Sequence, residues 1–374
     1  MIRDQLLEAV TDALADLGVD PVPDAVVVER PANRDHGDWS TNAALVSAKV
    51  AKRNPRELGQ ALADHLEAHR PAHVTALDVA GPGFVNFQLA PTWLHDVLTE
   101  VLTEGEEGYG RLDVGHGRSV NIEFVSANPT GPIHAGGGRW GAYGDSLARL
   151  MRRCGHKVHT EYYINDRGVQ TQLFAQSLEA AKVGEAPPEN GYLGQYIQDW
   201  AAEMPADADP VEWGKHRSLD EARQVLASMH VEFDTWSSEA ALVASGAAEA
   251  TLAELRAAGH VYTADGATWL RTTDFGDDKD RVLVRSDGDP TYFLPDIAYH
   301  RDKFRRGSLL IDILGADHHG YIGRMKAALL ALGHEASEYE AIIGQNVTLM
   351  RNGEEIRLSK RAGTMVMLAE LVDE

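Results

Sequence analysis

Two short polar segments, far apart in the chain, carry the residue types that hold the phosphates of a nucleotide. They are HAGG at 134–137 and RLSKR at 357–361. Glycines let a phosphate approach the backbone closely, and imidazole, hydroxyl and ammonium groups donate hydrogen bonds to its oxygens. If the two segments meet in space, they predict a triphosphate site in which Lys360 neutralises charge as pyrophosphate leaves.

The first segment lies between a predicted strand and a predicted helix. The strand should span 119–125, because Val120, Ile122 and Phe124 alternate with polar residues. After the glycines, apolar residues recur every three or four positions up to Cys154, which is typical of an amphipathic helix. A helix N-terminus presents unpaired N–H groups and a positive dipole end, so phosphate is expected at this turn.

Other interpretations of these segments stay open at this point. Gly136, Gly138 and Gly141 also form G-x-G-x-x-G, and Glu161 stands about where a dinucleotide fold has a ribose-binding acid. A dinucleotide-dependent enzyme is therefore one alternative, and a purely structural glycine turn is another. The approach NPTGPIH at 128–134 is stiffer and more polar than a dinucleotide turn requires. A Lys-Arg pair on a loop is by itself typical of solvated surface.

Several longer segments resemble one family across nearly the whole chain. They are GD at 37–38, TN at 41–42, GPGFVNF at 81–87, SANPTGP at 126–132, EYYIND at 161–166, DFGDDKDR at 274–281, DIAYH at 296–300 and GADHHG at 315–320. On these motifs the chain resembles the arginyl-tRNA synthetases, a family of class I aminoacyl-tRNA synthetases. Two positions depart from the family signatures: Gly137 replaces a second His, and Arg357-Leu358 replaces Lys-Met.

The resemblance implies ATP-dependent activation of L-arginine and its esterification to tRNA(Arg), with Mg²⁺ accompanying the nucleotide and no metal site made of protein alone. It also implies that tRNA is needed for arginine activation. It assigns the catalytic positions to His134, Gly136, Gly137, Ser359 and Lys360. It assigns ATP binding to His134, Gly136, Asp317, Lys360 and Arg361, with Asp317 on the ribose. The metal-site alternative for Asp317-His318-His319 is weak, because adjacent side chains seldom converge on one ion.

A pocket that selects arginine needs carboxylates placed for forked hydrogen bonds to the planar guanidinium. The resemblance matches Glu239, Tyr292 and Asp296 to the guanidinium side. It matches Ser126, Asn128 and Glu123 to the ammonium side. Asp296 alone would be equally compatible with a helix cap.

The net charge of −22 argues against indiscriminate nucleic-acid binding, because the whole-molecule field repels phosphate. Basic runs at 149–157 and 301–306 are candidates for local RNA contact, although solvated helix ends explain such runs as well. Asn42, Arg149 and Arg153 are predicted to contact tRNA.

Composition is typical of an intracellular enzyme. With 374 residues, 44% of them hydrophobic, the chain is long enough to bury a large core. Cys154 is the only cysteine, which indicates a reducing compartment. Charged residues interrupt the N-terminal apolar residues, and no apolar run is long enough for a bilayer. We therefore expect a cytoplasmic monomer with no membrane contact.

The expected fold is α/β: an N-terminal α+β appended domain at 1–108 and a Rossmann-like parallel-sheet catalytic domain at 109–374. Within the latter, an inserted α-rich region is expected at roughly 170–265, and 282–285, 309–314 and 341–343 are buried-strand candidates. The resemblance implies that the first domain contacts the outer corner of tRNA. The family's C-terminal anticodon-binding domain is expected to be absent from this sequence.

Overall fold

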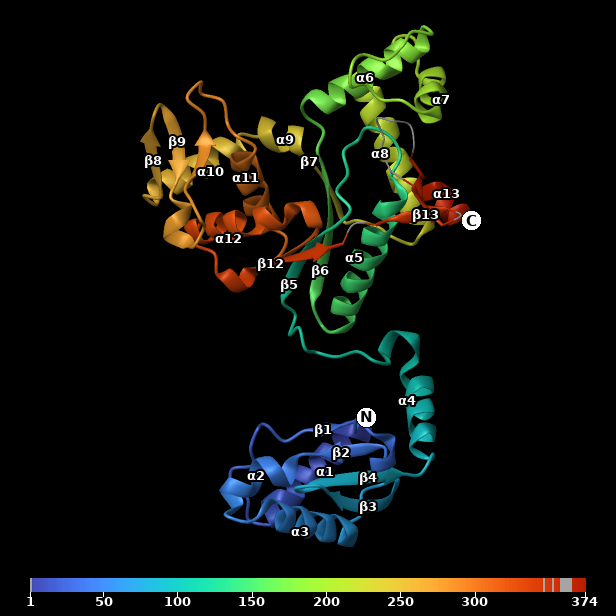
Figure 1. Ribbon diagram of the computed structural model, residues 1–374, viewed down its shortest axis with the longest axis vertical. Coiled ribbons are helices and arrows are strands. Elements are labelled where there is room, and N and C mark those ends of the chain that lie inside the picture. Colours follow the sequence, from blue (N-terminus) through green and yellow to red (C-terminus); the bar gives the residue numbers. More distant parts are fainter. Residues whose placement is uncertain (1, 346, 352, 357–364) are drawn as a thin grey trace. The chain divides into compact units, whose positions relative to one another are not determined.

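The chain divides into two compact units, Met1–Gly110 and Arg111–Glu374, each of which is described by itself (Figure 1). The computed structural model describes residues 2–345, 347–351, 353–356 and 365–374, and of residues 317–319, 351 and 354–356 it describes only the backbone. Across these described ranges, no helix is both long and apolar enough to cross a membrane.

The first unit is an α+β fold built on a four-stranded antiparallel sheet of order β1-β2-β4-β3. Leu6 and Leu14 from α1, Leu62 from α3 and Phe87 from β4 form its core, and each is fully buried. Its elements are α1 (Ile2–Asp16), β1 (Val28–Glu29), η1 (Arg34–His36), β2 (Trp39–Thr41), α2 (Ala43–Ala51), α3 (Pro55–Ala68), β3 (Val74–Ala80), β4 (Phe84–Leu89) and α4 (Trp93–Gly108).

The second unit is built on a five-stranded sheet of order β12-β11-β5-β6-β7, in which every pairing is parallel. This confirms the predicted Rossmann-like sheet. The chain leaves β5 toward β6 on one side and returns to β11 on the other, which places the topological switch point between β5 and β11. Ligands of open α/β sheets bind beyond the carboxyl ends of the strands at such a point.

The first half of this unit comprises β5 (Ser119–Glu123), α5 (Ala135–Arg153), β6 (Lys157–Ile164), α6 (Val169–Lys182), α7 (Gln195–Glu203), α8 (Pro210–Ser228), β7 (Thr235–Ser238), α9 (Glu239–Ala244) and α10 (Ala247–Ala257). The second half comprises β8 (Val261–Ala264), β9 (Ala267–Leu270), η2 (Thr272–Phe275), β10 (Arg281–Val284), α11 (Phe293–Lys303), β11 (Leu309–Gly315), η3 (Ala316–Tyr321), α12 (Ile322–Ala331), η4 (Ala336–Glu338), β12 (Tyr339–Gly344), β13 (Leu349–Arg351), β14 (Glu354–Ile356) and α13 (Leu368–Asp373).

Two strands lie elsewhere than the sequence pattern indicates. β7 falls inside the 170–265 stretch expected as an insertion, yet it pairs with β6 as the edge of the parallel sheet. Residues 282–285 do contain a strand, β10, but it belongs to a small antiparallel sheet with β9 and β8. Both strands have only four residues, which is too short for an alternation pattern to assign a partner.

Close packing explains part of the glycine pattern in α5. A Cβ at Gly144 would lie 2.2 Å from Cγ of Phe124, and one at Gly138 would lie 2.4 Å from a methyl of Leu368. Gly141 similarly faces Leu226, at 3.3 Å. These glycines therefore let α5 approach the sheet and its neighbouring helices, so the G-x-G-x-x-G spacing has a packing cause here.

The two faces of the sheet differ in polarity. Val120, Ile122 and Phe124 face α5 and α8 across an apolar core. Because side chains alternate along a strand, Asn121 and Glu123 face the opposite side, where Glu123 contacts Lys303 of α11. Both polar residues are nevertheless buried, so their partners must come from the protein.

Candidate active site

A cavity of about 360 Å³ opens at the carboxyl ends of β5, β6 and β11, beside the switch point. All six residues that the sequence matched to arginine binding line this one cavity: Glu123, Ser126, Asn128, Glu239, Tyr292 and Asp296. They come from three segments of the chain: the end of β5 with the loop after it, the start of α9, and the start of α11 with the residue before it. Tyr292 is 86% exposed, so it forms the rim, whereas Glu123 and Glu239 are buried.

The backbone at the end of β5 is strained where it enters this cavity. Val125 and Ser126 have φ angles of 69° and 43°, a region that non-glycine residues seldom adopt and that a β-branched residue almost never adopts. The turn aims the Ser126 hydroxyl back to donate to Glu123 Oε1 at 2.9 Å, and the Ser126 oxygen itself accepts the Tyr163 N–H at 3.1 Å. Such strain costs about 1–3 kcal/mol per residue and is characteristic of functional sites.

A buried ionic layer lies beneath the cavity. The ammonium of Lys303, at the end of α11, donates to Glu123 Oε2 at 2.7 Å and also to Asp312 Oδ1. The other Asp312 oxygen accepts from His300 Nε2 at 2.7 Å. Lys303 is completely buried and Asp312 is 2% exposed. Lys303 is therefore not available to RNA, which corrects the interpretation of 301–306 as a surface basic run.

Arg306, in the same run, is also committed within the protein. Its guanidinium makes two hydrogen bonds to the buried Glu161 carboxylate, from Nε at 2.9 Å and from Nη2 at 2.8 Å. Asn121 Nδ2 donates to the same carboxylate at 2.6 Å. Glu161 thus has a structural partner set on the α11 face of the sheet, and it is not placed as the ribose-binding acid of a dinucleotide turn.

The hydrogen bonds fix the charge of His300. Its Nδ1 lies 2.8 Å from the Asp296 carbonyl, which only accepts, and its Nε2 lies 2.7 Å from the Asp312 carboxylate. Both ring nitrogens therefore donate, and the ring is an imidazolium. Burial opposes this charge, but the Asp312 carboxylate raises the pKa of His300 above its usual value. Lys303 and His300 in turn hold the pKa of Asp312 well below its usual range, against the effect of burial.

Burial raises the pKa of both carboxylates on the guanidinium side. It raises the pKa of Asp296 to about 6; His300 opposes this shift, while Glu123 and Asp312 add to it. The Tyr321 hydroxyl also contacts Asp296 Oδ2. Burial raises the pKa of Glu239 as well, and the charge of Arg167 partly opposes that rise. An incoming cation would lower both pKa values and favour the charged forms.

The turn with His134 lies at the start of α5. His134 is the exposed N-cap residue of α5, in an extended conformation, and Gly136 lies beneath its ring. The chain that follows 357–364 returns to this turn: Ala135 N–H donates to the Val366 carbonyl at 2.9 Å, and Leu368 N–H donates to the Ile133 carbonyl at 2.8 Å. A Cβ at Gly137 would lie 2.5 Å from a methyl of Ile133, so this position has no room for a side chain unless Ile133 moves.

Four of the residues predicted to contact the nucleotide lie wholly or partly outside the described part of the chain. Ser359, Lys360 and Arg361 lie outside the described residues, and the side chain of Asp317 does too. The backbone of Asp317 belongs to η3, which directly follows β11 at the carboxyl edge of the sheet.

The predicted tRNA contacts have partners inside the protein. The Asn42 side chain makes two hydrogen bonds to the backbone of the loop before β1. It accepts from Val27 N–H at 2.9 Å and donates to the Ala25 carbonyl at 3.0 Å. Arg149 donates to Asp145 at 2.6 Å and to the His230 carbonyl at 2.5 Å. The guanidinium of Arg149 therefore helps to hold α5 against the α8–β7 connection, and Arg153 also has an interaction partner.

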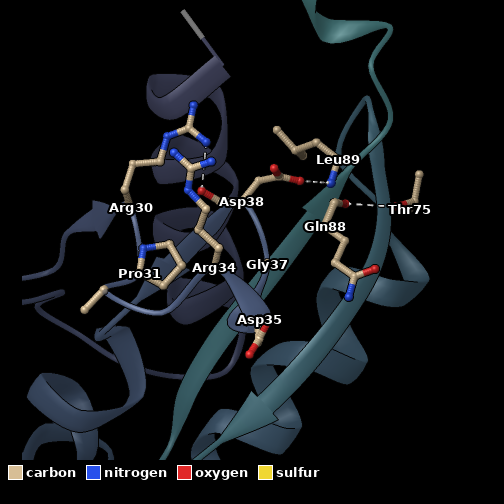
Figure 2. Close-up of a pocket in the computed structure, with 10 residues that line it drawn as sticks. Arg30, Pro31, Arg34, Asp35, Gly37, Asp38, Thr75, Gln88 and Leu89 are labelled. Atoms are coloured by element: carbon tan, nitrogen blue, oxygen red, sulfur yellow. Dashed lines mark hydrogen bonds between the residues drawn. The ribbon is translucent and has the colours of Figure 1, made fainter.

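The first unit has a cavity of its own, of about 810 Å³, which sequence reasoning did not find (Figure 2). Arg30 and Arg34 line it, and Arg30 lies over the Trp39 ring at 4.5 Å. The Asp38 carboxylate accepts from Leu89 N–H at 2.8 Å, which holds the GD motif against β4. Two guanidinium groups beside one cavity suit a phosphate-bearing ligand. In the sequence, the only signal for this cavity was that Arg30 and Arg34 lie just before the GD motif at 37–38.

Comparison with known proteins identifies the class first. Residues 4–89 match the family model "Arginyl tRNA synthetase N terminal domain" and residues 207–374 match "tRNA synthetases class I (R), catalytic domain". The parallel sheet is thus that of a class I aminoacyl-tRNA synthetase. An arginine–tRNA ligase of Frankia alni is 47% identical over 388 residues, covering 100% of this chain and 70% of that protein. The chain belongs to the arginyl-tRNA synthetase family.

Solved structures agree. A Campylobacter jejuni chain assigned to arginyl-tRNA synthetase has a TM-score of 0.68 and 36% identity, covering 76% of this chain and 66% of that one. Thermus thermophilus arginyl-tRNA synthetase shares the fold, with a TM-score of 0.64 and 22% identity over 92% of this chain and 66% of that one. The chain therefore spans about two thirds of the length of these solved relatives. Membership of this family removes the dinucleotide-dependent alternative.

Proposed function

We propose that the chain activates L-arginine with ATP and esterifies it to tRNA(Arg). The observation that carries this proposal is the cavity at the switch point, which Glu123, Glu239 and Asp296 all line. A site rich in buried carboxylates is costly to maintain unless a cation is bound. Arginine supplies two cationic ends, a guanidinium and an α-ammonium.

We further infer that the nucleotide binds next to this cavity, as its magnesium complex. His134 is the N-cap residue of α5, the helix that follows β5. Val366, six residues after Lys360 in the chain, is hydrogen-bonded at the same turn. The arginine carboxylate would attack the α-phosphorus in line, with loss of pyrophosphate, and the terminal ribose hydroxyl of tRNA would then displace AMP. His134 and Lys360 would donate to phosphate oxygens, and Asp317 would hold the ribose. This chemistry depends on positioning and charge neutralisation.

The remaining assignments follow from this proposal. Asn42, Arg149 and Arg153 are inferred to lie near bound tRNA, with the appended domain predicted at 1–108 at its outer corner. The protein is inferred to act as a cytoplasmic monomer, which a single cysteine and the family's substrates favour. A relative that activates or binds arginine for another acceptor is the second candidate function, because the family signatures are altered at Gly137 and Arg357.

Arginine-dependent ATP–pyrophosphate exchange by the 374-residue chain tests the proposal. We expect exchange when arginine, MgATP and tRNA(Arg) are all present, and esterified tRNA in a parallel charging assay. Exchange without esterification would favour activation for another acceptor. Arginine binding without exchange under any condition would contradict the proposed activity and favour a binding function.

Arginine affinity should depend on the protonation of Asp296. Arginine binds the carboxylate form, so affinity should fall as the pH drops through the pKa of about 6 that Asp296 has in the free protein. For one such group the expected loss between pH 7 and pH 5 is about tenfold. Titration calorimetry over this range measures it. Asp296→Asn should bind arginine more weakly and lose most of this pH dependence; a variant with the same pH profile would show that another group titrates.

A further inference from the structure

No role in the activity proposed above is assigned to Lys303. Its ammonium is nevertheless hydrogen-bonded to Glu123, which lines the arginine cavity. Of the two Glu123 oxygens, Oε2 accepts from Lys303 at 2.7 Å and Oε1 accepts from Ser126 at 2.9 Å. A carboxylate has about four acceptor positions, so each oxygen keeps capacity for a further donor. Glu123 lines the cavity, and the side chain of Lys303 is completely excluded from water.

These contacts fix the rotation of Glu123. A glutamate at the wall of a cavity would otherwise sample several rotamers and lose affinity to that freedom. Without Lys303, the Glu123 and Asp312 carboxylates would face one buried space without the ammonium that joins them, which disfavours the present orientation of Glu123. Lys303 reaches both, and they lie on β5 and β11, the strands that flank the switch point.

We propose that Lys303 is a positioning residue for the α-ammonium of arginine: it holds the Glu123 carboxylate in the orientation in which Glu123 and Ser126 together receive that ammonium. This inference rests on the proposed function, and it adds a residue that never touches the substrate. The neighbouring guanidinium carboxylates, Glu239 and Asp296, make no hydrogen bond to Lys303 among the described contacts.

The test compares two ligands that differ only at the α-carbon. L-Arginine and 5-guanidinopentanoic acid share the guanidinium, the chain and the carboxylate, and only arginine has the ammonium. By titration calorimetry, Lys303→Met should weaken arginine binding by about 10- to 100-fold and the amine-free analogue by less than about threefold. Loss of the same factor for both ligands, or unchanged arginine binding, would overturn the assignment.

Arg306→Met is the matched control. Arg306 is also a cation paired with a buried carboxylate on this face of the sheet, but its partner, Glu161, does not line the cavity. The control should lower the midpoint of urea unfolding and leave the ratio of the two dissociation constants unchanged. A change in that ratio equal to the change in Lys303→Met would make the effect a general consequence of loosening the sheet.

A second variant guards against misfolding of Lys303→Met. The double change Lys303→Met with Asp312→Asn removes one positive and one negative charge, so it leaves less uncompensated charge in the interior. It should show the same selective loss for arginine, because Glu123 still lacks its partner; an unselective loss would count against the proposal. If the unaltered protein binds neither ligand, the proposed function itself fails, and that outcome is visible before any variant is made.

Discussion

Lys360→Ala slows arginine-dependent ATP–pyrophosphate exchange by about 10²-fold or more, and it leaves arginine binding nearly unchanged: this is the first result we expect. Charge on the β- and γ-phosphates grows as pyrophosphate leaves, so a cation placed there stabilises the transition state more than the bound substrates. The loss should therefore appear in kcat and in kcat/KM to a similar extent. Initial exchange rates at saturating arginine, with tRNA present, measure it.

Lys360→Arg is the matched variant for this experiment. It keeps the positive charge and replaces a compact ammonium by a planar, forked group, so it should recover only part of the rate. Equal rates for the unaltered protein and Lys360→Ala would remove Lys360 from the chemistry. A large increase in the arginine dissociation constant would instead place it in the amino-acid pocket.

The second large effect is expected at Glu239. This carboxylate is 8% exposed at the start of α9, and burial raises its pKa, so a bound guanidinium would stabilise its charged form. Glu239→Gln keeps the shape and removes the charge, which leaves a buried guanidinium half paired. Truncating one partner of a buried charge pair costs about 2–5 kcal/mol, which corresponds to a loss in arginine affinity of about 30-fold to several thousand-fold.

Calorimetric titration with arginine and with ATP separates this effect from a general loss of folding. ATP affinity should stay within about threefold, because the nucleotide turn lies at α5 and not at α9. Glu179→Gln is a suitable control, since Glu179 is exposed on α6 and does not line the cavity. If Glu239→Gln binds arginine as the control does, the guanidinium lies elsewhere in the cavity.

The sequence alone predicts the strand, the glycine turn and α5, because alternation and three-to-four spacing report burial directly. The parallel sheet is confirmed, and the six matched residues line one cavity. Their roles stay predictions, since bound substrate would be needed to assign them. The prediction that the two phosphate-binding segments meet also stays open, because Ser359, Lys360 and Arg361 lie outside the described residues.

What the sequence does not reveal is the ionic layer under that cavity. Lys303 and Glu123 are 180 positions apart, and a lysine at the end of a helix is usually solvated. One signal was available: Asp312 stands between Ile311 and Ile313 in an otherwise apolar strand, and a lone acid there requires a buried partner. The positive φ angles of Val125 and Ser126 had no local signal, because their side chains disfavour that conformation.

The hydrogen bonds that join Ala135 to Val366 and Leu368 to Ile133 have a consequence for the two departures from the family signatures. They use main-chain atoms only, so proline at 135 or 368 would remove a donor and break the seam. The two departures from the family signatures, at 137 and 357, involve none of the four bonded main-chain atoms. The place where 366–368 rejoins the start of α5 is therefore set by backbone hydrogen bonds, independently of those two departures.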